Sequence, residues 1–140
     1  MADGNGTKLA TKASYPEGTY IFNMNNAAAS SHTFDMGDSG KIFMVYSTVA
    51  RTITLPKVQA GLRFKFIMTD TTADSSITTS EGTALFKGGA ECGDAYLTLA
   101  GTTIVLEAAG AVGDHLEFIS DGTYWYVSGH GSHDASFSVS

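Results

Sequence analysis

The residues best suited to chemistry lie near the C-terminus, where His130, His133 and Asp134 stand in the stretch HGSHD. Imidazole and carboxylate groups are common zinc ligands, and His115 or His32 could complete a ligand set. The glycine and serine between these residues favour a loop, in which the His-x-x-His spacing does not bring ligands together. We therefore expect a solvated tail and no metal site. One alternative stays open: near a threefold axis, three copies of one of these histidines could hold an ion.

Three acidic residues upstream, Asp114, Glu117 and Asp121, raise the question of a glycosidase. Such an enzyme holds two carboxyl groups at a set separation across a cleft. Asp114 follows a glycine and Asp121 precedes one, so turns account for both residues. Glu117 is expected on the outer face of a strand, and no cleft is indicated. The sequence predicts no catalytic pair of carboxylates.

Nucleophile motifs give no stronger signal. Ser132 has histidines beside it, but their spacing does not match the Gly-x-Ser-x-Gly nucleophile elbow. Cys92 is the one cysteine of the chain, so no internal disulfide can form. It has no basic neighbour to lower its pKa, which favours a buried, inert thiol. We predict no catalytic residue, no cofactor and no enzymatic activity.

The stretch that organises the chain is residues 112–129, which predict a β-hairpin. Asp121-Gly122 suits the two central positions of a type I′ turn. Folding about that turn places Ser120 opposite Thr123, and successive side chains then alternate between two faces. One face carries Leu116, Phe118, Trp125 and Val127, and the other carries His115, Glu117, Ile119, Tyr124, Tyr126 and Ser128.

The first face of this hairpin is expected in the core, with Trp125 as its largest side chain. On the second face, Tyr124, Tyr126 and Ile119 are the predicted contacts with another subunit or a partner, because aromatic side chains are enriched at protein interfaces. Trp125 lies on the opposite face from both tyrosines, so the three rings cannot form one shelf for a sugar.

Short strands separated by turn signals predict the rest of the fold. Strands are expected over residues 18–24, 32–36, 41–48, 51–55, 62–69, 77–80, 84–87, 96–99, 102–107 and 137–139. The dense apolar run at 41–48 suggests a strand buried on both faces, and 25–31, 70–76 and 88–95 read as loops. We expect an all-β protein, an antiparallel β-sandwich of jelly-roll type over residues 18–140, with a flexible N-terminal arm at residues 1–17. No internal repeat of fixed period is evident.

Charge and composition limit the partners. The chain has 140 residues and a formal charge of −6, and its eight basic residues are scattered. Phosphate backbones and anionic membranes are bound by clustered Lys and Arg, so we expect neither nucleic acid nor membrane as a partner. The first residues lack a signal-peptide pattern, so synthesis in a cytoplasm is expected. Only 16% of residues are charged, and a surface of low charge suits coverage by a neighbour.

Two segments resemble virion structural proteins of tailed bacteriophages: RTITLPKVQAGLRFKFI at residues 51–67 and GDHLEFISDGTYWYVSG at residues 113–129. The resemblance covers roughly half the chain. It implies a small β domain of the head decoration or cement type, often trimeric, or a part of a fibre or tail tip. It brings no catalytic residues with it.

The expected function is therefore that of a virion structural protein, a decoration or cement protein that binds the phage capsid surface as a homotrimer. Its partners would be the major capsid protein and further copies of itself. The alternative is a fibre or tail-tip domain that recognises host surface glycans. A hydrolase ranks last, because the sequence shows no triad, phosphate loop or metal motif.

Overall fold

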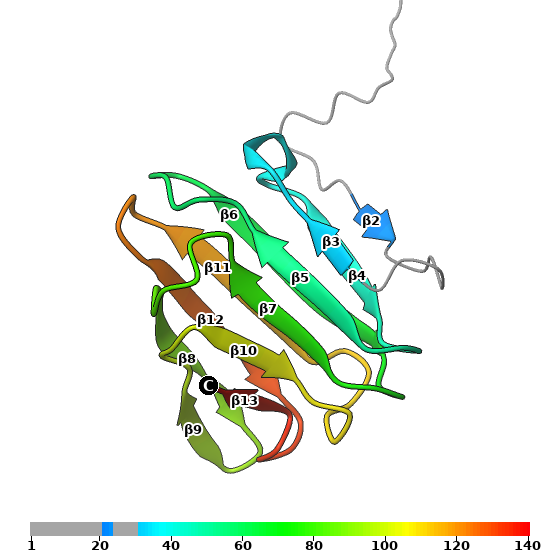
Figure 1. The fold of residues 1–140 in the computed structure, drawn as a ribbon. Helices are drawn as coiled ribbons and strands as arrows, with labels where there is room; N and C mark the ends of the chain where they lie inside the picture. Colours follow the sequence, from blue (N-terminus) through cyan, green and yellow to red (C-terminus); the bar gives the residue numbers. More distant parts are fainter. Residues whose placement is uncertain (1–20, 24–30) are drawn as a thin grey trace, which may run out of the picture.

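The computed structural model describes residues 21–23 and 31–140, and the predicted arm at residues 1–17 lies outside them. The described chain forms two mixed β-sheets that face each other, with one short 3-10 helix, η1 (Met36–Asp38) (Figure 1). The all-β prediction is confirmed. The seven-stranded sheet has the order β2 (Ile21–Asn23), β4 (Ile42–Tyr46), β6 (Arg63–Asp70), β11 (His115–Ser120), β12 (Trp125–Gly131), β8 (Phe86–Cys92) and β9 (Ala95–Thr98). The five-stranded sheet has the order β13 (Phe137–Val139), β10 (Thr103–Leu106), β7 (Ser75–Thr79), β5 (Arg51–Leu55) and β3 (Ser31–Thr33).

The strands from β2 to β7 alternate between the two sheets, so this part of the chain winds as a flattened coil, which we call the spiral. A chain that crosses to the opposite sheet after each strand returns to the first sheet running in its original direction. Ile21 accordingly pairs with Ile42 and Ile42 with Lys65, both in parallel, so one coil adds 21 residues and the next adds 23. The spiral is a structural repeat that we did not predict.

The predicted antiparallel, jelly-roll-like sandwich is wrong in its strand pairing, because both sheets are mixed, and its jelly-roll topology is not confirmed. Among the described strands, β2–β4, β3–β5, β4–β6, β5–β7 and β8–β12 pair in parallel, and the other five pairs are antiparallel. The four parallel pairs among β2 to β7 follow from the spiral, because neighbouring strands of one sheet come from successive coils. The parallel pair of β8 with β12 lies outside the spiral. The antiparallel pairs include the β11–β12 and β8–β9 hairpins and the return of β13 along β10. In the other two, β11 pairs with β6 and β10 pairs with β7.

One core cluster fills the space between the sheets, with buried side chains from both. Phe43, Phe64 and Phe66 stack in neighbouring strands, with ring centroids 5.3–5.9 Å apart. The strand at 41–48 was predicted to be buried on both faces, and this is wrong: Phe43 and Val45 are fully buried, but residues 42, 44 and 46 are only half-buried. Residues 42, 44 and 46 lie on the outer face of the sheet, and no other layer of the described chain covers that face (Figure 1).

The loop predicted at 88–95 is also wrong, because β8 and β9 occupy most of it. Gly88 adopts φ +105, and a Cβ there would collide with the backbone oxygen of Val127 on β12. A Cβ at Gly89 would collide with the backbone oxygen of Leu97 on β9. These glycines permit close approach of strands, a role that a sequence does not distinguish from the punctuation of a loop.

Candidate functional site

The hairpin between β11 and β12 forms as predicted, but its turn is centred one residue further along the chain. Asp121 N–H donates to the Tyr124 carbonyl over 3.3 Å, and Ser120 pairs with Trp125 rather than with Thr123. Gly122 and Thr123 are therefore the central residues, with Gly122 at φ +98. Gly122 supplies the positive φ that a two-residue hairpin loop needs at its first central position, so the predicted turn centred on Asp121-Gly122 is wrong.

The side chain of Asp121 explains this shift. Its carboxylate accepts hydrogen bonds from the backbone N–H groups of Thr123 at 2.8 Å and Tyr124 at 2.9 Å. These bonds lower the pKa of Asp121, and they build an Asx turn at the first corner position of the hairpin. The aspartate therefore works as the residue before the turn, not as one of its two central residues.

The predicted faces of the hairpin are nevertheless confirmed. Moving the turn by one residue moves each cross-strand partner by two, and two residues is the side-chain period of a strand. The inner face is buried throughout, and Trp125 is fully enclosed against Phe64 with ring centroids 5.7 Å apart. The buried members are Leu116, Phe118, Trp125 and Val127.

The outer face carries the three residues predicted as an interface, and we call them, with Lys87, the hairpin patch. Ile119 and Tyr126 are cross-strand partners, with exposed fractions of 43% and 47%. The Tyr124 ring meets the Tyr126 ring edge-on at 6.5 Å. Lys87 of β8 holds its ammonium 4.8 Å from the centre of the Tyr124 ring, within the range of a cation–π contact. The structure thus gathers these side chains on one surface.

Charged groups border the hairpin patch. The carboxylate of Asp121 acts on the Tyr126 hydroxyl and raises the pKa of that tyrosine. On the other side, Arg63 of β6 pairs with Ile119 in the strand register and forms a salt bridge of 3.1 Å with Glu117. An apolar and aromatic centre with a charged rim is the pattern of a protein-binding surface.

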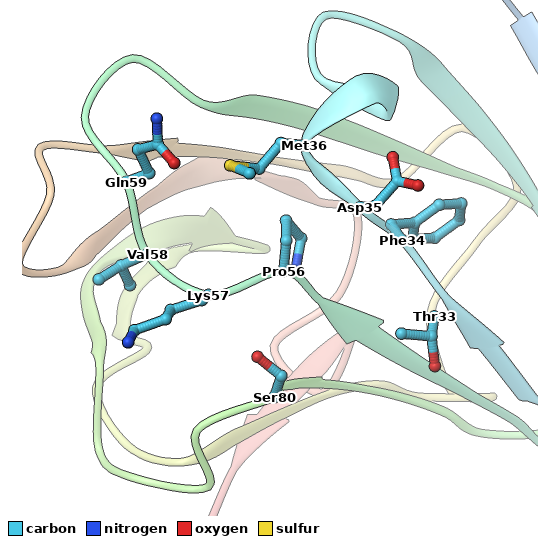
Figure 2. Close-up of a pocket in the computed structure, with 9 residues that line it drawn as sticks. All are labelled: Thr33, Phe34, Asp35, Met36, Pro56, Lys57, Val58, Gln59 and Ser80. Carbon is cyan, nitrogen blue, oxygen red and sulfur yellow. The ribbon is translucent and has the colours of Figure 1, made fainter.

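A second feature is a cleft of about 310 Å³ at the ends of β3, β5 and β7, three parallel strands of the five-stranded sheet (Figure 2). Met36, with 54% of its surface exposed, lies on one side, and the loop of residues 56–59 forms the other. Its lining is mostly apolar, and its volume lies at the lower end of the range for ligand pockets. The cleft could hold a small apolar group or one side chain of a partner. The lining residues are Thr33, Phe34, Asp35, Met36, Pro56, Lys57, Val58, Gln59 and Ser80.

The structure separates the residues of HGSHD. His130 lies on the outer face of β12, opposite His115 of β11. His133 lies in the connection from β12 to β13, and its backbone N–H donates to Ser136 Oγ over 3.0 Å. Asp134 accepts a hydrogen bond from the backbone of Asp94. Within residues 21–23 and 31–140, no three His, Cys, Asp or Glu side chains come close enough together to hold a metal ion.

The three acids do not form a catalytic pair in the part of the chain that the structure describes. Asp114 is buried and accepts hydrogen bonds from Ser132 N–H at 3.0 Å, from Ser132 Oγ at 2.6 Å and from Ala111 N–H at 2.9 Å. It ties the β10–β11 connection to the β12–β13 connection. Glu117 is engaged with Arg63, and Asp121 serves the turn. Each acid has a structural partner that accounts for its position.

Cys92 is buried at the end of β8, as predicted. Burial raises the pKa of its thiol, and the nearby carboxylates of Asp114 and Asp134 raise it further. A raised pKa lowers the fraction of nucleophilic thiolate, so this thiol is poorly suited to covalent chemistry.

Sequence reasoning missed Lys87 and every residue of the cleft. Lys87 stands 37 positions before Tyr124, and only the parallel pairing of β8 with β12 brings the two together. The cleft assembles from loops that follow three different strands of the spiral, so no local pattern signals it. The sequence signal for the cleft is weak: Met36 and Pro56 are apolar residues that lie next to turn residues at strand ends.

Comparison with models of protein families, with curated proteins and with solved structures finds no match to this chain. Among the described residues, none belongs to a helix long and apolar enough to span a bilayer.

Proposed function

We propose that this chain is a structural protein of a phage particle, a decoration or cement protein that binds the major capsid protein on the head surface as a homotrimer. The observation that carries the proposal is the hairpin patch, in which Ile119 and Tyr126 are exposed on the outer sheet face and charged groups form the rim. The resemblance of residues 51–67 and 113–129 to virion proteins supports the same role. Those segments correspond to β5, β6 and the β11–β12 hairpin.

The mechanism would be burial of the hairpin patch. Covering apolar surface gains roughly 25 cal/mol for each Å² removed from water, so a small patch gives a modest affinity. A trimer presents three such patches at once, and multivalent attachment raises the overall affinity by orders of magnitude without any strong single contact. A cement protein that occupies many equivalent capsid sites gains from this arrangement.

The test combines oligomeric state with retention on capsids. We expect the purified protein to be a trimer by size-exclusion chromatography with light scattering. When it is added to capsids made without it, we expect it to remain bound after repeated washing. Ile119→Lys and Tyr126→Ser should each reduce retention at least about tenfold, because one buried anchor contributes about 1.4 kcal/mol or more. Tyr96→Ser is the matched control, since Tyr96 is 63% exposed on the edge strand β9.

Equal retention of the wild type and both patch variants would contradict the role of the hairpin patch. A strictly monomeric protein would contradict the trimer. Removal of residues 1–17 tests the predicted arm separately, and retention of the truncated chain at the wild-type level would remove the arm from the proposal.

A second candidate is glycan recognition by a fibre or tail tip. The exposed Tyr126 ring favours it, because a sugar can stack on an aromatic face while Asp121 and Lys87 offer hydrogen bonds at its edge. A glycan array together with immuno-electron microscopy of the particle separates the candidates. Glycan binding lost in Tyr126→Ser and a label on the tail would favour this candidate, and a label on the head would favour the decoration protein.

A further inference from the structure

Two histidines face each other on the outer surface of the seven-stranded sheet. His115 of β11 and His130 of β12 are direct cross-strand partners in the register. Their ring centroids lie 6.4 Å apart with the ring planes tilted by 40°. His115 is half-buried and His130 is exposed, so both rings are accessible from solvent. The sequence places them 15 residues apart, and only the hairpin register brings them together.

The orientation of one ring is fixed by a backbone group. The Nδ1 atom of His115 lies 3.2 Å from the carbonyl oxygen of Gly113. A carbonyl oxygen only accepts hydrogen bonds, so Nδ1 donates this one, and in the neutral ring Nε2 then keeps its lone pair for a metal ion. A backbone carbonyl that holds one ring nitrogen while the other is free is the arrangement typical of a metal-ligating histidine.

We propose that His115 and His130 together bind a divalent transition metal ion of the zinc, nickel and copper class. Metal–nitrogen bonds are about 2.0–2.1 Å long, so the two histidines can share one ion after rotation of the exposed His130 side chain, with His115 held by the Gly113 carbonyl. Water completes the coordination. Imidazole suits these metals, whereas calcium and magnesium prefer oxygen ligands and are not expected to bind.

The surroundings add a negative charge beside the pair. Glu91 of β8 is the register partner of His130 on the side away from His115. It lies on the exposed surface, where its carboxylate favours a cation on the neighbouring histidine. The row across the sheet is therefore His115, His130 and Glu91, with the two imidazoles as ligands and the carboxylate as an electrostatic neighbour.

The test is isothermal titration calorimetry of the tag-free full chain with zinc chloride, and nickel chloride and magnesium chloride serve as comparisons. We expect one zinc ion per chain, comparable nickel binding and no magnesium binding. His115→Ala and His130→Ala should each weaken zinc binding at least about tenfold, because loss of an outer-shell partner alone typically costs 10–100-fold. Glu91→Gln should weaken it less than either histidine variant.

His133→Ala is the matched control, because His133 lies in the connection after β12 and outside the pair. Copper(II) paramagnetic resonance gives an independent readout, with coupling to two nitrogens in the wild type and to one in either histidine variant. The proposal is overturned if His115→Ala or His130→Ala binds zinc as tightly as the wild type, or if only His133→Ala loses binding. Capsid retention is measured separately, with and without zinc, so that a failure of zinc binding is distinguished from a failure of capsid binding.

Discussion

Trp125 is the largest fully buried side chain of the β11–β12 hairpin. Its side chain is fully buried, and its indole N–H has no hydrogen-bond partner among the described residues. We expect Trp125→Ala to lower the free energy of unfolding by about 3–5 kcal/mol through the cavity it opens. Trp125→Phe should cost less, because it keeps most of the packing and removes the unsatisfied donor. Urea unfolding measures both, and a midpoint for Trp125→Ala equal to that of the wild type would place this residue outside the core.

Asp114 makes stability depend on pH. Burial by itself would raise the pKa of its carboxyl, but the hydrogen bonds from Ser132 and Ala111 outweigh burial and lower that pKa below its ordinary value of 3.8. A carboxyl with a lowered pKa in the folded state stabilises the fold above its ordinary pKa. That contribution is lost as the pH falls through the folded value.

We therefore expect Asp114→Asn to destabilise the protein at pH 7 by about 1–3 kcal/mol, the cost of breaking a buried charge-assisted hydrogen bond. The difference between the variant and the wild type should shrink as the pH falls below 3.8. Chemical unfolding at pH 7 and pH 3 measures it. A difference that stays constant with pH would show that the charge of Asp114 has no part in stability.

At the scale of elements, the β11–β12 turn depends on Gly122. Its φ of +98 is a conformation that costs a residue with a Cβ roughly 1–2 kcal/mol. We expect Gly122→Ala to lower the free energy of unfolding by that amount. Gly122→Asn should lose less, because asparagine tolerates positive φ better than alanine. Thermal unfolding of the two variants checks the order, and a reversed order would argue against a conformational origin.

At the scale of the whole molecule, the sheets end at four edge strands among those described: β2, β9, β3 and β13. Edge strands expose backbone groups that can pair with another chain, so each is a possible route to assembly. If the subunits of the trimer pair through backbone groups at an edge strand, side-chain variants of the hairpin patch should remain trimeric. Ile119→Lys that remains trimeric but loses capsid retention would therefore place the hairpin patch on the capsid and the subunit contacts at an edge.

The sequence by itself determined the local features. Alternating apolar residues predicted β5, β6 and the hairpin, and they predicted that Trp125 is buried while Ile119 and Tyr126 face outward. These predictions held because the side-chain period of a strand is a property of neighbouring residues. They survived even the wrong turn at Asp121-Gly122, since the shift of two residues in pairing preserves the faces.

Only the tertiary structure decided which strands are neighbours. The spiral brings together strands from successive coils, and the pairing of β8 with β12 brings Lys87 to Tyr124. The structure also set the hairpin register that makes His115 and His130 partners. A strand presents hydrogen-bonding groups on both edges whatever its side chains, so its sequence encodes which face is buried but not which strand lies beside it. That choice is made by the packing of the two sheets around their shared core.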